Sequence, residues 1–108
     1  ILKYFKSGTS IALMIDQRVS QGIKSLLFGN SALTTTIPAQ FVKKFNCKVV
    51  PIYIERKSDE SFMLEIMQPI NFDNNQTIEN ITLKLNQLLE KMIIRNPYQW
   101  IWSHNRWK

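Results

Sequence analysis

The sequence predicts an α/β fold, and three features of it indicate this class. Two compact apolar runs, residues 10–15 and 47–55, have the composition of strands buried on both faces of a sheet. A helical pattern separates them, so strand, helix and strand would form one βαβ unit. An alternating segment and a long amphipathic pattern then follow. With 108 residues, the chain has room for one modest core.

The first half of the chain is expected to contain one strand, one long loop and one helix. Gly8 stands where a helix C-cap would end an initial amphipathic stretch, and the first strand, residues 10–15, comes next. Residues 17–34 have no usable period, which predicts a long loop, and compact domains keep such loops mostly for function. Thr36 then caps a helix that ends near Asn46.

The second half is expected to complete a partial open mixed sheet. The second strand, residues 47–55, would lie parallel to the first, with Pro51 in its middle. Because proline cannot donate to a sheet ladder, Pro51 predicts a bulge, an edge position or an irregularity that shapes a pocket. Residues 61–68 alternate and would pair with the second strand as an antiparallel hairpin. Thr77 caps a long C-terminal amphipathic helix over residues 78–95.

The net charge of +6 is unevenly distributed along the chain. Residues 1–57 hold nine basic and two acidic side chains. Residues 58–90 hold one basic and six acidic side chains, and residues 91–108 hold four basic and no acidic ones. This pattern indicates an anionic partner: a nucleic acid, an anionic lipid surface or an acidic protein. With Cys47 as the one cysteine and a single histidine, the sequence predicts no disulfide, metal site or cofactor. No apolar run approaches the ~18 residues of a membrane span.

Asp16 is the strongest candidate for a functional side chain in the sequence. A carboxylate directly after a buried parallel strand lies at the carboxyl edge of the sheet, where open α/β folds place ligands. Gln17 adds an amide beside it. A structural interpretation, in which Asp16 caps a turn, stays open. Arg56 ends the second strand on the same side and either meets an anion there or is a solvated residue facing Asp59 and Glu60.

The C-terminal tail combines tryptophans with cations. Such a combination suits contact with membrane headgroups or stacking on single-stranded nucleic acid. Trp100 and Trp102 are expected to lock the tail onto the core. Trp107, Arg106 and Lys108 are expected to be free to contact a membrane or lipid.

The tail PYQWIWSHNRWK resembles the closing signature of the lipid A biosynthesis lauroyl/myristoyl acyltransferase family. In that family, a Pro-x-Gln-Trp-x-Trp segment precedes His-x-Arg-Trp-Lys. The resemblance covers nearly the whole chain and continues through Asp16 with Gln17, Phe28 with Gly29, Val50 with Pro51, Arg56, and the segment around Glu90. It implies part of a glycerolipid-acyltransferase-like fold.

The resemblance implies transfer of a fatty acyl chain from acyl carrier protein to a hydroxyl of a lipid A precursor, at the cytoplasmic side of a Gram-negative inner membrane. The family's general base is the histidine of a His-x4-Asp/Glu motif, which deprotonates the accepting hydroxyl. His104 has too few residues after it to complete that motif. Residues 1–108 are therefore expected to be the C-terminal part of one acyltransferase domain, inactive alone, with membrane attachment through the missing N-terminal part.

Only residues that match the family's pattern take roles from the resemblance. Asp16 would support catalysis, while Gln17, Pro51 and Arg56 would contact substrate. With this interpretation, we expect no cofactor and no nucleic-acid partner. The rival interpretation from another class is a non-catalytic basic module that binds nucleic acid or anionic lipid, and a third is a pseudoenzyme that keeps only the scaffold.

Overall fold

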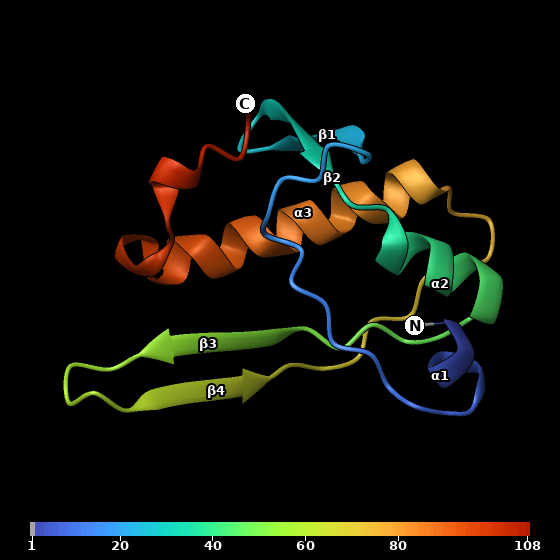
Figure 1. Ribbon diagram of the computed structural model, residues 1–108, viewed down its shortest axis with the longest axis horizontal. Coiled ribbons are helices and arrows are strands. Elements are labelled where there is room, and N and C mark those ends of the chain that lie inside the picture. Colours follow the sequence, from blue (N-terminus) through green and yellow to red (C-terminus); the bar gives the residue numbers. More distant parts are fainter. Residues whose placement is uncertain (1) are drawn as a thin grey trace.

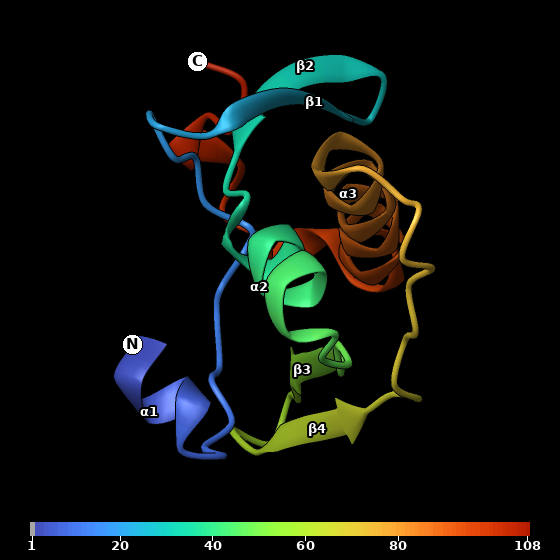
Figure 2. The same cartoon turned by 90° about the vertical axis from the view of Figure 1, so that its right-hand side faces the viewer.

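The computed structural model describes residues 2–108, which form three α-helices and two β-hairpins (Figure 1). The helices are α1 (Leu2–Lys6), α2 (Ile37–Phe45) and α3 (Ile78–Arg95), followed by 3₁₀ turns at Pro97–Gln99 and Trp102–His104. The strands form two separate antiparallel pairs, β1 (Ile23–Leu27) with β2 (Asn30–Thr34) and β3 (Ile52–Arg56) with β4 (Phe62–Ile66). Helices α2 and α3 lie between the two hairpins in both views (Figure 2).

The predicted α/β class is confirmed, as are both long helices and the second hairpin. Helix α3 begins after Thr77, whose Oγ1 accepts a hydrogen bond from the Asn80 N–H at 3.1 Å. Helix α2 ends at Asn46, which has a φ of 50° and donates its N–H to the Val42 carbonyl at 2.9 Å. These features are set by neighbours in the sequence, which is why the pattern of residues revealed them.

The predicted βαβ unit is wrong, because residues 10–15 form no strand. They belong to an irregular segment that runs from α1 to β1 (Figure 1). Met14 in this segment is 83% exposed, whereas Ile15 packs against the core. The apolar run therefore supplies a few anchoring contacts. Both sheets in residues 2–108 are two-stranded and antiparallel, so the expected mixed sheet is corrected to two separate hairpins.

The long loop expected over residues 17–34 is also wrong, because this segment contains β1 and β2. Phe28 and Gly29 connect the strands with φ angles of 52° and 75°, as a tight type I′ hairpin turn requires. Two inward-facing residues of the hairpin, Ser25 and Thr34, are polar and buried. Polar residues at buried positions hide the alternation by which a strand is recognised.

Pro51 lies immediately before β3, so the expectation that it interrupts the middle of a strand is wrong. It is buried, and its carbonyl accepts the Met67 N–H at 2.9 Å. Because the start of a strand tolerates proline, no bulge is needed there.

Two apolar clusters share α3. The first joins α2 to the N-terminal half of α3 through the buried residues Ala39, Val42, Phe72, Ile81 and Leu85. The second joins the β1–β2 hairpin to the C-terminal half of α3 through Leu27, Ala32, Leu89 and Ile93, with Trp100 and Trp107 packed against it. Fully burying one such leucine contributes ~2 kcal/mol. Helix α3 therefore links the two parts of the core.

Candidate functional site

The segment that follows Asp16 lies against the C-terminal tail. The Arg18 Nε donates a hydrogen bond to the Lys108 carbonyl at 2.8 Å, although the two residues are 90 positions apart. The Val19 N–H donates to the Leu33 carbonyl in β2 at 3.4 Å. These two contacts hold the half-buried Asp16 beside the tail and the first hairpin.

Arg106 in the tail is part of a buried polar network. Its side chain is 1% exposed, and its two terminal nitrogens donate to the Leu33 carbonyl at 2.6 Å and to the Thr34 Oγ1 at 2.9 Å. The Thr34 Oγ1 also accepts from the Asn86 Nδ2 at 3.1 Å and donates to the Ala32 carbonyl at 3.0 Å. The network thus connects the tail, β2 and α3.

The charge of Arg106 lacks a directly bonded carboxylate. No ion pair within residues 2–108 includes this guanidinium, and its Nε has no hydrogen-bond partner there. Burial lowers the pKa of Arg106 below its ordinary value, while the negative charge of Asp16 opposes that shift. Asp16 and Arg106 therefore interact through space at the point where the loop, β2 and the tail meet.

The turn of the first hairpin is fixed by α3 and by the tail. The Phe28 N–H donates to the Glu90 Oε1 at 2.6 Å, and the Trp107 Nε1 donates to the Leu27 carbonyl at 2.9 Å. A positive φ is unfavourable for a residue as bulky as Phe28. Because its N–H is bonded to a carboxylate and its ring lies 6.2 Å from the Trp102 ring, centre to centre, the surroundings hold this conformation.

The predicted site residues do not gather in one place. Within residues 2–108, no hydrogen bond or ion pair joins Asp16 or Gln17 to Pro51 or Arg56. Arg56 is exposed at the end of β3, and its guanidinium carbon lies 5.6 Å from the centre of the Phe62 ring. Since no strand precedes Asp16 in the part of the chain that the structure describes, the expectation that parallel strands bring Asp16 and Arg56 to one sheet edge is wrong.

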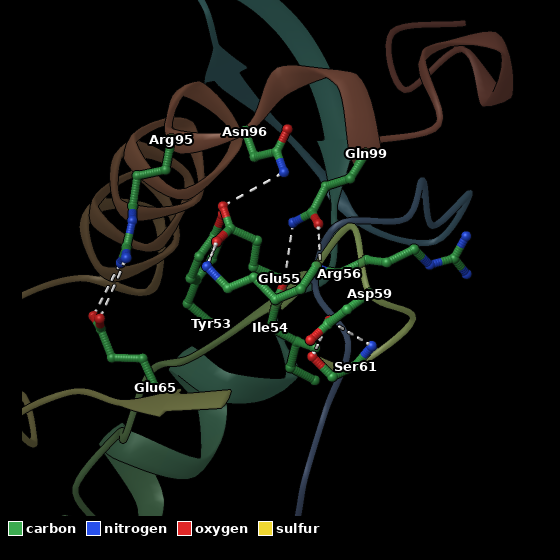
Figure 3. Close-up of polar contacts among 11 residues, drawn as sticks. Tyr53, Ile54, Glu55, Arg56, Asp59, Ser61, Glu65, Arg95, Asn96 and Gln99 are labelled. Atoms are coloured by element: carbon green, nitrogen blue, oxygen red, sulfur yellow. Dashed lines mark hydrogen bonds and ion pairs between the residues drawn. The ribbon is translucent and has the colours of Figure 1, made fainter. Parts of the chain in front are cut away.

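Gln99 in the tail signature has a structural role that the sequence did not reveal. Its Nε2 donates to the Ile54 carbonyl at 2.9 Å, and its Oε1 accepts the Arg56 N–H at 3.1 Å (Figure 3). The side-chain amide thus pairs with the open edge of β3 as a neighbouring strand would. A second link joins Arg95 at the end of α3 to Glu65 in β4 at 2.9 Å.

The tail residues are arranged differently from the prediction. Arg106 is buried and Trp107 is half-buried against the second core cluster, so neither side chain is free for a lipid. Trp102 is 47% exposed, whereas Trp100 is half-buried, with 4.6 Å between the centres of the two rings. Lys108 is exposed as expected. Within residues 2–108, the side-chain hydrogen bonds of Arg106 and Trp107 go to the first hairpin, so the tail sequence carried no signal for this arrangement.

The described residues offer no constellation for a metal ion. Within residues 2–108, no three His, Cys, Asp or Glu side chains are grouped so that they could hold one. Cys47 is half-buried beside the α2–α3 cluster, and burial raises the pKa of its thiol, which disfavours the reactive thiolate. None of the helices in this part of the chain combines the length and hydrophobicity needed to cross a bilayer.

The fold and the site define a mixed α/β module whose polar interior is organised by its own C-terminal tail. A family model for the bacterial lipid A biosynthesis acyltransferases matches residues 1–108, the whole chain. The chain belongs to this family, and the resemblance carried by its tail is confirmed. No curated protein matches the sequence. Two small antiparallel sheets with a long helix are consistent with part of an acyltransferase domain.

Proposed function

We propose that this chain contributes the Asp16 side of an acyltransferase site that moves a fatty acyl chain from acyl carrier protein to a hydroxyl of a lipid A precursor. The family match over residues 1–108 supports the chemistry. One observation supports the position of the site above all others. The segment after Asp16 contacts the tail that bears the family signature, through the hydrogen bond from Arg18 to Lys108.

The reaction needs a base, and we propose that a His-x4-Asp/Glu motif outside these residues supplies it. The one histidine of this sequence, His104, is exposed within the tail signature. The base would take the proton of the accepting hydroxyl, the oxygen would attack the thioester carbonyl carbon, and the carrier thiol would leave. Positive groups would stabilise the oxyanion that develops.

Asp16 would support this reaction by contacting the substrate. An ionised carboxylate accepts hydrogen bonds and can therefore orient substrate hydroxyl groups. Gln17 is exposed beside it and can add a donor and an acceptor. Arg56 is exposed at the end of β3 and would meet an anionic group of the glycolipid. Pro51 is buried, so its contribution would be to shape the start of β3.

We further propose that the reaction takes place at the cytoplasmic side of the inner membrane of a Gram-negative bacterium, with attachment through a segment outside residues 1–108. The net charge of +6 would attract both an anionic glycolipid and an acidic carrier protein. Exposed aromatic and apolar residues of the tail, Tyr98, Ile101 and Trp102, suit contact with lipid headgroups.

Replacing Asp16 tests the proposal. In an acyltransferase chain that carries residues 1–108 together with a His-x4-Asp/Glu motif, Asp16→Asn is expected to lower acyl transfer tenfold or more, a loss of ~1.4 kcal/mol of transition-state stabilisation. Asp73→Asn, at an exposed carboxylate in the loop before α3, is the matched control and is expected to keep the wild-type rate. Unchanged turnover of folded Asp16→Asn protein would remove Asp16 from the site.

Two assays test the remaining parts of the proposal. The purified 108-residue chain is expected to transfer no acyl group, since it lacks the base, and detectable transfer would contradict this division of roles. In the chain that includes the motif, transfer from acyl carrier protein is expected to be faster than transfer from the corresponding coenzyme A thioester. Equal rates with the two donors would contradict the assignment of the donor.

A further inference from the structure

Arg106 is a buried cation that the proposed reaction does not use directly. Its two terminal nitrogens bond to neutral oxygens, those of the Leu33 carbonyl and the Thr34 hydroxyl, and within residues 2–108 its Nε is unpartnered. Taking a guanidinium out of water without an ion pair is costly. A neutral side chain could fill the same space at a lower cost, so the charge calls for an explanation.

The contacts of Arg106 reach the segment after Asp16 through the Leu33 carbonyl of β2. The Leu33 carbonyl that accepts from Arg106 at 2.6 Å also accepts the Val19 N–H at 3.4 Å. Two residues after Arg106, the Lys108 carbonyl accepts from the Arg18 Nε at 2.8 Å. The tail thus holds this loop directly at Arg18, and β2, to which Arg106 is bonded, holds it at Val19; both points lie within three residues of Asp16.

We propose that Arg106 is the positioning residue for Asp16: with the Arg18–Lys108 hydrogen bond, its buried guanidinium fixes the loop that carries the carboxylate. We call Arg18, Arg106 and Lys108 the tail clasp. This inference rests on the proposed function of Asp16 and deepens it. It gives the buried charge a role, because the guanidinium holds β2 and the tail, the two segments that contact the Asp16 loop, in place.

The geometry also explains why the residue is an arginine. Its planar fork donates to the Leu33 carbonyl and to the Thr34 Oγ1 at the same time, and Thr34 is bonded in turn to Asn86 of α3. A lysine would keep the charge but could not bond both oxygens in the same directions. Through Thr34 and Asn86, Arg106 therefore connects the surroundings of the Asp16 loop to α3, the longest helix of the fold.

A double-mutant cycle in the acyltransferase chain that includes the base tests the clasp. Asp16→Asn is expected to lower kcat tenfold or more, and Arg106→Gln about fivefold, with KM unchanged because Arg106 does not touch substrate. In the Asp16→Asn background, Arg106→Gln is expected to cost less than about twofold, because both changes remove the same interaction. A purely structural role for Arg106 would give equal fold-losses in the two backgrounds.

Folding is checked by the melting temperature of each variant. Arg95→Gln, which removes an exposed arginine of α3 that pairs with Glu65 in the second hairpin, is the matched control and is expected to keep the wild-type kcat. If Arg106→Gln does not fold, Arg18→Gln takes its place, because Arg18 is exposed and its loss opens the clasp without leaving a buried gap. Arg18→Gln is expected to lower kcat about twofold, and only when Asp16 is present.

The outcomes separate the inference from the proposed function. If Asp16→Asn lowers kcat but folded Arg106→Gln keeps the full rate, or if the two losses multiply, the clasp is overturned and the function stands. With Arg18→Gln as the replacement, an unchanged rate overturns the clasp in the same way. If Asp16→Asn leaves the rate unchanged, the proposed function of Asp16 is overturned, and the clasp with it.

Discussion

The two β-hairpins have the same strand length and the same antiparallel pairing, yet only the first contributes residues to either of the two apolar clusters, while the second buries Tyr53 alone among its strand residues. In the first hairpin, Leu27 is fully buried against α3. In the second, one whole face of apolar side chains is 48–66% exposed, namely Ile52, Ile54, Phe62, Leu64 and Ile66. Strand pairing alone therefore does not decide which hairpin is buried.

The difference lies in the side chains that reach each hairpin from elsewhere. Buried or half-buried donors and acceptors from α3 and the tail bond to the first hairpin, namely Asn86, Glu90, Arg106 and Trp107. The second hairpin is held by the exposed residues Gln99 and Arg95 and by one half-buried contact, the hydrogen bond from the Asn96 Nδ2 to the Glu55 Oε1 at 3.4 Å. Hydrogen bonds made away from water stabilise more than those that water can replace.

Truncating one leucine in each hairpin should give the largest difference in stability loss between the two hairpins. Leu27→Ala removes a fully buried side chain and is expected to destabilise the chain by about 3 kcal/mol. Leu64→Ala makes the same chemical change on the exposed face and is expected to cost less than ~0.5 kcal/mol. Urea denaturation of both variants measures the two values. Equal losses would mean that the second hairpin is as well packed as the first.

Gly22 offers a backbone test of how tightly the first hairpin is packed. A Cβ at this position would lie 2.1 Å from the Thr34 carbonyl oxygen. Gly22→Ala is therefore expected to destabilise the chain by ~2 kcal/mol through overpacking, whereas Ser58→Ala in the exposed β3–β4 turn should change its stability by less than ~0.5 kcal/mol. Thermal unfolding compares them, and a Gly22→Ala variant with the wild-type melting temperature would argue against this close approach.

The tail contacts of the two hairpins should show a smaller difference in their contribution to the free energy of unfolding. Trp107→Phe removes the indole N–H that donates to the part-buried Leu27 carbonyl and is expected to cost ~1 kcal/mol. Gln99→Leu removes two hydrogen bonds from the exposed edge of β3, where water can replace them, so its cost is expected to be lower. A larger loss for Gln99→Leu in chemical denaturation would reverse this ranking.

Removing the ion pair at the second hairpin should have the smallest effect on stability. This effect should depend on pH. The hydrogen bond from Arg95 holds the pKa of Glu65 below its ordinary value. A lowered folded-state pKa stabilises the fold above the unfolded-state pKa, and this contribution is lost as the pH falls through the folded-state pKa. The melting-temperature difference between wild type and Glu65→Gln should therefore be small at neutral pH and vanish in acid. A difference that is independent of pH would exclude this origin.

The sequence predicted the elements whose signals are local. Helix α3 carries its own period and its Thr77 cap, and the second hairpin shows clean alternation. The first hairpin escaped prediction because Ser25 and Thr34 are polar residues at buried positions, and the Asn86 that bonds Thr34 comes from a distant segment.

The candidate site was predictable only in its parts. Asp16 and the tail signature could both be singled out from the sequence. Their connection could not, because Arg106 reaches the loop through the Leu33 carbonyl of β2, a strand that the sequence did not reveal. A buried arginine also looks like a surface cation until its partners are known.

Native-state hydrogen exchange measures the contrast between the hairpins most directly. The ladder amides of β1 and β2 are expected to exchange as slowly as those of the C-terminal half of α3, because they open as one unit. The ladder amides of β3 and β4 are expected to exchange at least about tenfold faster. Equal or slower exchange in β3 and β4 would contradict the conclusion that α3 and the tail hold the first hairpin more tightly than the second.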